Sequence, residues 1–434
     1  MLDRSPPLVS VIMANFNGQE HLARAVHSVL AQTVTDVELL LADDASTDAS
    51  LPIAERIMRQ DDRLRILRGP RNSGPAAARN RALTHACGEW IAVVDSDDII
   101  HPERLERLIV AAETERTDGI ADDLIFFGKS PQQHGQVLSQ TLLLDTPVDL
   151  TPGALLDMPT LGYLKPVLRR SVVGELRYRK DMRIGEDHDF YMRYLLRGGR
   201  LRLIGQSYYL YRRHGNSISH RQHPEDVTAM LNAQDDLVAQ FPDIPLDLAS
   251  RFSARRNELD RSLQFERLVR DIKQQKWRAV LHMICKIPAL LAPLLRAMRE
   301  HWQNRIGQKQ APQDTAPSDV VLQTDEQIRD RPPQGAMPLT IPKHPGQWEA
   351  ADWAKFMAAL PARVDRVFAK GAPGRFALGY VPQCNAAILE AEDSLWTDSF
   401  EFGPADLQSR NQPGVAPLYT APTRGDPVPG KETG

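Results

Sequence analysis

Carboxylates are concentrated at one point of the sequence, directly after a run of apolar residues. Residues 89–94 read EWIAVV, and Asp95, Ser96, Asp97 and Asp98 follow. Three buried carboxylates this close together repel one another unless a cation lies among them. Hard divalent cations prefer oxygen ligands, and Mg²⁺ is commonly held by one or two carboxylates together with substrate phosphates. We therefore predict a divalent-cation site at Asp95 and Asp97; the alternative is a solvated turn whose aspartate caps the next helix.

A second acidic group opens residues 183–197, which have helical periodicity. It reads Gly-Glu-Asp-His-Asp from position 185 to position 189. The helix dipole favours negative charge at a helix start by about 0.3–1 kcal/mol, which accounts for one acidic residue but does not require three. A positioned carboxylate can accept a proton from an attacking hydroxyl group and accelerate that step roughly 10²–10⁴-fold. We predict this role for Asp187, with Glu186 as the alternative.

Two further polar groups follow apolar runs near the N-terminus. Asn15 follows residues 8–14, and Asp43 and Asp44 follow residues 37–42. A carboxylate in such a place can accept a hydrogen bond from a nucleobase N–H or a ribose hydroxyl. The alternative for the two aspartates is a cap on the next helix, a role that neighbouring polar residues can also fill. We predict that these residues contact a nucleotide.

Two basic side chains complete the candidate site. Residues 70–81 read PRNSGPAAARNR, in which Gly74 permits a tight turn before a helix that carries Arg79. An arginine binds phosphate oxygens in a fork geometry, so we predict that Arg79 contacts a diphosphate; the alternative is a solvated surface arginine. His214 follows a predicted strand at 201–212 and is predicted to ligate the metal or contact the diphosphate, with a structural histidine as the alternative.

Short apolar runs alternate with segments of helical periodicity in the first 115 residues. The predicted strands are 8–14, 37–42, 64–67 and 89–94, and the predicted helices are 19–31, 49–60, 101–115 and one that follows a loop within 72–86. This alternation indicates an α/β fold in which helices flank a mostly parallel sheet. Ligands of such sheets bind beyond the carboxyl ends of the strands, which is where the acidic groups fall.

Composition and cysteine usage narrow the class of protein. The 434 residues carry a formal net charge of -3, which provides no general attraction to nucleic acid. The three cysteines are far apart, which argues against a disulfide framework and fits a reducing compartment. The N-terminal residues have no apolar stretch of the signal-peptide type. These features predict a cytoplasmic protein without a nucleic-acid partner.

Composition also divides the chain into three predicted parts. Residues 1–225 carry the polar groups and form the predicted catalytic domain, and residues 226–306 are predicted to be largely helical. Residues 307–434 hold 16 of the 32 prolines. We therefore predict a mostly disordered, proline-rich tail there, with a short helical piece within 346–370.

Residues 279–298 raise the question of membrane contact. They are mostly apolar but contain two prolines and charged residues, and they are flanked by basic residues and by Trp277 and Trp302. A spanning helix needs roughly 20 predominantly apolar residues, whereas basic and tryptophan flanks are typical of segments in the membrane interface. We predict peripheral contact with the cytoplasmic face of the inner membrane; a buried helical hairpin and a membrane span are the alternatives.

Six segments within residues 8–219 together resemble the family-2 glycosyltransferases, which have the GT-A nucleotide-diphospho-sugar transferase fold. In order, they are VSVIMANFNGQEHLARAVHSVLAQT, ADDASTD, NSGPAAARNRAL, GEWIAVVDSDD, GEDHDFYMR and YRRHGNSIS. The segment LGYLKPVLRR at 161–170 and the overall layout are similar to bacterial exopolysaccharide enzymes of the succinoglycan biosynthesis type.

The resemblance implies an inverting, single-displacement transfer of a hexose from a nucleotide diphosphate sugar, with UDP-sugar as the expected donor. The acceptor would be a glycan or a lipid-linked glycan. Asp44 would contact the base with Asp43 beside it, Asp95 and Asp97 would hold ribose and Mg²⁺ or Mn²⁺, and Asp187 would be the general base. One departure is Phe16, where the family often has a tyrosine, so the ring is kept and the hydroxyl is lost.

Two other classes of function compete with this interpretation. A catalytically inactive nucleotide-sugar-binding protein would keep the fold but would be expected to lose at least one of Asp95, Asp97 and Asp187, which are all present. A nucleotidyltransferase would carry a glycine- and arginine-rich loop after the first strand, whereas this chain has Asn-Phe-Asn-Gly at 15–18. The sequence therefore favours the transferase.

Overall fold

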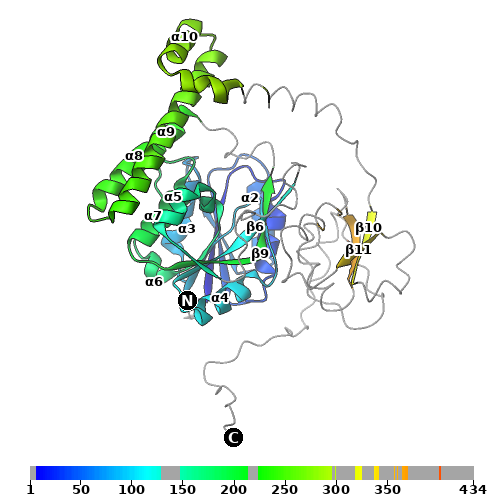
Figure 1. The fold of residues 1–434 in the computed structure, drawn as a ribbon. Helices are drawn as coiled ribbons and strands as arrows, with labels where there is room; N and C mark the ends of the chain where they lie inside the picture. Colours follow the sequence, from blue (N-terminus) through cyan, green and yellow to red (C-terminus); the bar gives the residue numbers. More distant parts are fainter. Residues whose placement is uncertain are drawn as a thin grey trace.

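A computed structural model describes residues 6–128, 147–213 and 223–295, together with 299, 318–324, 337–341, 356, 359, 364–369 and 400–401. The strands of its larger sheet are β1 (Val9–Asn15), β2 (Val37–Asp43), β3 (Leu64–Arg68), β4 (Trp90–Val93), β5 (Ile99–Ile100), β6 (Gly119–Gly128), β7 (Val148–Leu150), β8 (Val167–Arg169) and β9 (Leu201–Arg213). Their order is β3-β2-β1-β4-β8-β6-β9-β5, with β7 paired to β9. Figure 1 shows helices on both sides of this sheet.

The first half of the sheet is parallel, as the sequence predicts. β1 pairs in parallel with β2 and β4, and β2 pairs in parallel with β3. All seven residues of β2 are buried, which is typical of a parallel strand covered on both faces. The register places Asn15 opposite Asp43, so the polar residues that follow these strands meet at one edge of the sheet.

The second half of the sheet is mixed, so the prediction of a mostly parallel sheet is correct only for the first half. β8 is antiparallel to both β4 and β6, and β5 and β7 are antiparallel to β9. Only β6 and β9 are parallel among the described strands of this half. The strands β5, β7 and β8 have two or three residues each, too few to show a hydrophobic period in the sequence.

Helices of the first 200 residues cover the sheet with one apolar face. The helices are α1 (Leu22–Leu30), α2 (Ser50–Met58), α3 (Pro75–His85), α4 (Arg104–Thr114), α5 (Pro152–Asp157), α6 (Arg170–Val173) and α7 (Glu186–Leu196). In α1 the buried apolar residues are Leu22, Ala25, Val26 and Val29. Their spacing of three and four residues matches the helical period and explains why this segment was predicted as a helix.

The described residues between 223 and 295 are largely helical, as predicted for the segment 226–306. They contain α8 (Pro224–Gln240), α9 (Leu246–Lys273), α10 (Trp277–Lys286) and the 3₁₀ turn η3 (Pro288–Leu290). In Figure 1, α8 and α9 run side by side along one side of the molecule, and α10 lies at the far end of α9. A small apolar cluster of Leu268, Val280 and Leu290 holds α9, α10 and η3 together.

Within the described parts of the chain, no single helix is long and apolar enough to cross a membrane. Trp277–Lys286 and Pro288–Leu295 meet the length and composition criteria only when taken together, and they are bent by 111° where they join.

Four strands lie in the part of the chain that we predicted to be mostly disordered. They are β10 (Ser318–Thr324), β11 (Met337–Ile341), β12 (Val364–Ala369) and β13 (Phe400–Glu401), in the order β11-β10-β12-β13. The helical piece predicted within 346–370 is wrong for 364–369, which form β12, whereas Phe356 and Ala359 are helical. The high proline content averaged over this region conceals short β-branched stretches such as SDVVLQT. The rest of residues 307–434 lies outside the described residues.

Candidate active site

A cavity of about 1160 Å³ lies at the carboxyl ends of β1, β2 and β4. Its walls come from the loops after these strands, the start of α3, the segment before β8, the start of α7 and the end of β9. The helix α9 contributes Arg255, Glu258, Leu259 and Ser262 to the same wall. The site residues predicted from the sequence that line it are Asn15, Asp44, Arg79, Asp95, Asp97, Glu186 and Asp187.

A hydrogen bond between Asn15 and Asp43 connects the ends of β1 and β2. Nδ2 of Asn15 donates to Oδ1 of Asp43 at 3.0 Å and to Oγ of Ser46 at 3.2 Å, and the backbone N–H of Ser46 donates to Oδ2 of Asp43 at 3.0 Å. Asp43 is buried and is not among the cavity residues, so its part in donor binding stays a prediction. Oδ1 of Asn15 is buried and has no hydrogen-bond partner within the described chain. That oxygen lies against Gly18, so close that an added Cβ would clash with it.

Asp44 borders the cavity and also holds the loop that precedes α3. Its Oδ2 accepts the backbone N–H groups of Ser73 and Gly74, both at 2.7 Å, and its Oδ1 lies 3.4 Å from Nη2 of Arg81. Gly74 has φ of 87°, a backbone conformation that residues with a Cβ adopt only with strain. Asp44 therefore sets the start of α3, the helix that carries Arg79.

Arg79 is only 5% exposed and contacts three carboxylates. Its Nη2 donates to Oδ1 of Asp95 at 2.7 Å, and its Nη1 lies 2.8 Å from Oε1 of Glu186 and 3.3 Å from Oδ1 of Asp187. Burial disfavours the guanidinium cation, but the carboxylates of Asp187, Asp95 and Glu186 outweigh it and raise the pKa of Arg79 well above its usual value. The sequence alternative of a solvated surface arginine is therefore wrong. Diphosphate contact by Arg79 stays a prediction.

Lys165 is the site residue that the sequence reasoning missed. It is 3% exposed, and its Nζ lies 2.8 Å from Oδ2 of Asp187 and 3.0 Å from Oδ2 of Asp95. Burial opposes its charge, but Asp187 and Asp95 raise the pKa of the Lys165 ammonium well above its usual value. The available signal was a single lysine between the apolar residue Leu164 and Pro166, directly before a buried strand.

The three aspartates that follow β4 occupy different environments. Burial favours the neutral acid of Asp95, but Lys165 and Arg79 outweigh it and hold its pKa well below the usual range. Asp98 is buried and accepts hydrogen bonds from Tyr209 Oη at 2.8 Å and from the backbone N–H of Arg212 at 2.7 Å. Burial, together with Asp97 and Asp95, raises the pKa of Asp98. Asp98 thus ties this loop to β9, whereas Asp95 and Asp97 line the cavity.

The acidic group at the start of α7 also divides between two roles. Glu186 and Asp187 line the cavity, whereas Asp189 pairs with Arg193 at 2.6 Å on the same helix and does not line it. Burial is the main cause that raises the pKa of Glu186, and the charge of Asp187 adds to it. The structure therefore brings both candidates for the general base to the end of β4.

The cavity includes Asp95 and Asp97, the carboxylates predicted to hold a divalent cation. Within the described residues, no group of three or more His, Cys, Asp and Glu side chains is arranged to hold a metal ion. His214 lies outside the described residues. Both oxygens of Asp95 already contact cations, Oδ1 with Arg79 and Oδ2 with Lys165, whereas Asp97 also lines the cavity. A cation that also binds substrate phosphates needs only one or two protein carboxylates. The donor set therefore fits a cation that enters with a diphosphate.

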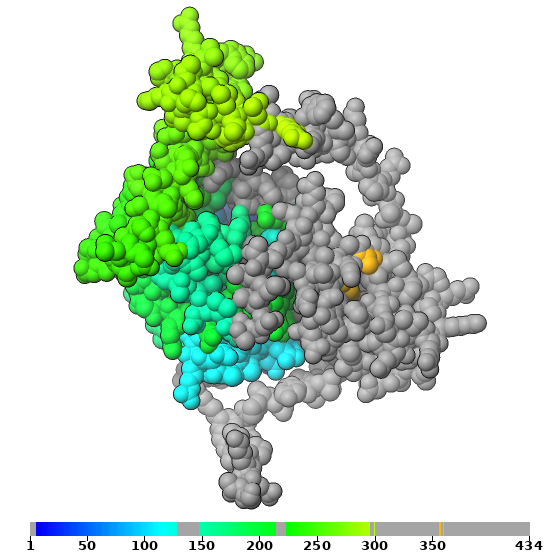
Figure 2. Space-filling model, viewed as in Figure 1, coloured from blue at the N-terminus to red at the C-terminus, as the bar shows by residue number. Residues whose placement is uncertain are grey.

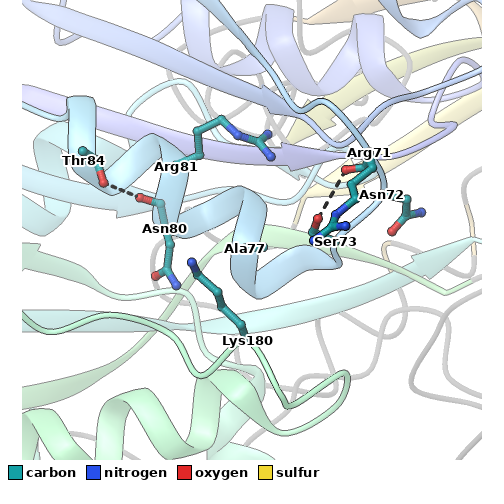
Figure 3. A pocket seen from close by; sticks show the side chains of 8 residues that line it. All are labelled: Arg71, Asn72, Ser73, Ala77, Asn80, Arg81, Thr84 and Lys180. Atoms are coloured by element: carbon teal, nitrogen blue, oxygen red, sulfur yellow. Dashed lines mark hydrogen bonds between the residues drawn. The ribbon is translucent and has the colours of Figure 1, made fainter.

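A second cavity of about 770 Å³ lies beside α3 (Figure 3). Its lining residues are Arg71, Asn72, Ser73, Ala77, Asn80, Arg81, Thr84 and Lys180. This set contains basic and amide side chains but no carboxylate, so it offers neither a general base nor a metal ligand. The cavity at the strand ends is therefore the candidate active site.

Comparison with known proteins identifies a family and several relatives of this chain. Residues 10–146 match the model of "Glycosyl transferase family 2". Two relatives are the succinoglycan biosynthesis proteins ExoO and ExoU of Rhizobium meliloti (strain 1021). ExoO is 31% identical over 54% of this chain and 69% of its own, and ExoU is 32% identical over 55% of this chain and 72% of its own.

Two solved structures are also similar. One is S. aureus TarS 1-349 in complex with UDP-GlcNAc, with a TM-score of 0.46 and 23% identity over 56% of this chain and 69% of that chain. The other is the mannosyltransferase PcManGT from Pyrobaculum calidifontis in complex with GDP-Man and Mn²⁺, with a TM-score of 0.43 and 16% identity over 69% of this chain and 81% of that chain.

An α/β sheet with flanking helices and a cavity at its strand ends agrees with the fold that the family resemblance predicts, since ligands of such sheets bind beyond the carboxyl ends of the strands. With relatives above 30% identity that it covers over more than two thirds of their length, the chain belongs to glycosyl transferase family 2. It is a glycosyltransferase.

Proposed function

We propose that the chain transfers a hexose from a nucleotide diphosphate sugar to a glycan or lipid-linked acceptor with inversion at the anomeric carbon. UDP-hexose is the first donor to test. The observation that carries this proposal is that Asp187 and Asp95 line one cavity and share two buried cations, Arg79 and Lys165. In this arrangement the proposed proton acceptor, Asp187, lies beside the strand ends at which we propose that the diphosphate binds.

The proposed reaction is a single displacement. The acceptor hydroxyl oxygen forms a bond to the anomeric carbon, and its proton passes to the carboxylate of Asp187. The bond from the anomeric carbon to the diphosphate oxygen breaks on the opposite face, and its electron pair leaves with the diphosphate. Glu186, whose pKa is raised by burial and by Asp187, is the alternative proton acceptor; Arg79 pairs with both carboxylates, and Lys165 pairs with Asp187 as well.

The donor would lie along the ends of β1, β2 and β4. Asn15 lines the cavity and is proposed to contact the nucleoside, and the half-exposed ring of Phe16 can pack on a base. Asp44 and Arg79 are the further donor contacts that we propose. Asp97 and Asp95 would hold a divalent cation, Mg²⁺ or Mn²⁺, which would supply positive charge to a diphosphate leaving group.

The acceptor is proposed to belong to an exopolysaccharide or another cell-surface polysaccharide. The names of the two relatives above support this assignment. In this proposal residues 1–225 form the catalytic domain, and the helical segment 226–306 carries it to the membrane surface at which a lipid-linked acceptor is held.

The surface of the α10 region supports such membrane contact. Trp277 is 58% exposed and Leu281 is 64% exposed, and Leu291 and Leu295 are exposed as well. Residues 272–299 contain lysine and arginine but no acidic residue. Figure 2 shows this yellow-green region at the outer end of the helical projection. Exposed tryptophan and leucine beside basic residues suit the interface of an anionic membrane.

A transfer assay tests the proposal. The full chain would be incubated with UDP-glucose, UDP-galactose or UDP-N-acetylglucosamine, Mn²⁺ and lipid-linked acceptor extracts, and labelled product would be followed. Asp187→Asn is expected to lower the rate at least 10²-fold with donor affinity nearly unchanged. Asp189→Asn is the matched control because Asp189 lies on the same helix outside the cavity. Equal loss of donor binding and transfer in Asp187→Asn would show that Asp187 is structural.

A further inference from the structure

We infer that Lys165 is a positioning residue that holds the general base Asp187 in place relative to the donor-side carboxylate Asp95. The inference rests on the proposed function, because it presumes the roles given there to the two aspartates. Lys165 contributes one ammonium group that contacts both, at 2.8 Å to Asp187 and 3.0 Å to Asp95. These two carboxylates come from distant parts of the chain, the end of β4 and the start of α7.

The backbone around Lys165 is itself held in place. Pro166 restricts the residue before it to extended conformations. The carbonyl oxygen of Lys165 accepts from Nη2 of Arg104, and the carbonyl oxygen of Leu164 accepts from Tyr191 Oη at 2.8 Å. A lysine side chain is flexible, so fixing its backbone and both of its carboxylate partners is what gives the ammonium a defined position.

Arg104 is in turn fixed by a buried ion pair. Its Nη2 lies 2.7 Å from Oδ1 of Asp122, and neither side chain is exposed. Oδ2 of Asp122 also accepts the backbone N–H of Tyr208 at 3.0 Å, which ties the pair to β9. The backbone at Lys165 is therefore restrained by buried contacts. A positioning group needs such restraint if it is to hold a reacting group within a fraction of an ångström.

Arg79 does not make this lysine redundant. Arg79 approaches the other oxygen of each aspartate, Oδ1 of Asp95 and Oδ1 of Asp187, whereas Lys165 contacts Oδ2 of both. Arg79 also pairs with Glu186, so it is shared among three carboxylates. With Lys165 removed, Oδ2 of Asp187 loses its hydrogen-bond donor and the carboxylate is free to turn about its side-chain bonds.

The effect on transfer follows from the geometry of proton acceptance. A misplacement of about 1 Å in a reacting group can cost about 10²-fold in rate. Lys165→Met, which keeps the apolar stem and removes the ammonium, is expected to lower kcat about 10²-fold while the KM for the donor changes less than about fivefold. Lys165→Arg keeps a positive charge at this position, and its kcat is expected to be at least tenfold higher than that of Lys165→Met.

A double-mutant cycle in the full chain tests whether Lys165 acts through Asp187. Transfer rates would be measured for Lys165→Met, Asp187→Asn and the double variant, with labelled UDP-hexose as the donor. In the Asp187→Asn background, Lys165→Met is expected to lower the residual rate less than about threefold, because the base that it positions is gone. Lys180→Met is the matched control, since Lys180 lines the other cavity. Lys165→Gln takes the same place in the cycle if Lys165→Met does not fold.

The outcomes separate this inference from the function on which it rests. Wild-type transfer by Lys165→Met, with Asp187→Asn inactive, overturns the role of Lys165 and leaves the proposed function standing. A full 10²-fold further loss in the Asp187→Asn background overturns it as well, because the lysine would then act independently of the base. Undiminished transfer by Asp187→Asn overturns the role of Asp187 as general base and this inference with it, whereas absence of transfer by the unmodified chain overturns the proposed function.

Discussion

Arg79 pairs with three carboxylates of the cavity, and its replacement by methionine gives a quantitative test of the charge balance there. Three carboxylates, Asp95, Glu186 and Asp187, surround two buried cations, Arg79 and Lys165. If all five are ionised, their formal charge is -1, and Arg79→Met changes it to -2. Removing one partner of a buried ion pair costs about 3–5 kcal/mol. We expect Arg79→Met to lower the free energy of unfolding by that amount at pH 8.

The pH dependence of that loss is also predicted. Burial and Asp187 already raise the pKa of Glu186, so without Arg79 the Glu186 carboxyl takes up a proton at a higher pH still and relieves part of the repulsion. The loss should therefore be smaller at pH 5 than at pH 8. Arg79→Met/Glu186→Gln restores the formal charge to -1 and should recover at least 1 kcal/mol at pH 8.

Guanidinium unfolding followed by circular dichroism measures these differences. The two-state assumption needs checking with a second probe, since the chain has more than one structural part. A loss below about 1 kcal/mol for Arg79→Met, or a loss that does not depend on pH, would refute the argument that Arg79 compensates buried carboxylates.

Three further predictions concern the same site and the surface near α10. The pKa of Glu186 is raised in the folded chain, so protonation of this carboxyl group stabilises the fold at low pH. This contribution is lost as the pH rises above about 4.5 through the folded pKa. Glu186→Gln should therefore flatten the dependence of the free energy of unfolding on pH in that range. Asp97→Asn should weaken UDP binding at least tenfold in Mn²⁺ and leave it unchanged in a chelator, which calorimetry would detect. Trp277→Ala/Leu281→Gln should reduce sedimentation with vesicles of phosphatidylglycerol at least fivefold, because both side chains are exposed. Transfer to a soluble acceptor should be unchanged. Unaltered sedimentation would show that this surface does not bind the membrane.

The parallel half of the sheet and its strand ends were predictable because local patterns determine them. The apolar run of β2 is buried at every position, and the carboxylates that follow β4 lie where the sequence predicted an edge of the sheet. Asp187 was also predicted in the site, since a helix start does not require three acidic residues. These inferences need only neighbours in the sequence.

The remaining features depend on contacts between residues far apart in the sequence. Lys165 is unremarkable in the sequence until folding brings Asp95 and Asp187 to its ammonium group. Arg79 resembles a surface arginine until α7 covers it with Glu186. Asp43 has the same residue type as Asp44 next to it, yet both of its carboxylate oxygens accept hydrogen bonds from Ser46 in the turn after β2. Side-chain partners of this kind cannot be inferred from spacing alone.

Calorimetric titration of the full chain with UDP, GDP and their hexose conjugates, each with and without Mn²⁺, tests the central claim most directly. The account predicts that one nucleotide and its sugar bind at the cavity more tightly in Mn²⁺, and that Asp97→Asn removes the metal-dependent part. Absence of binding to every nucleotide and nucleotide sugar, with and without Mn²⁺, would contradict a donor site at the ends of β1, β2 and β4.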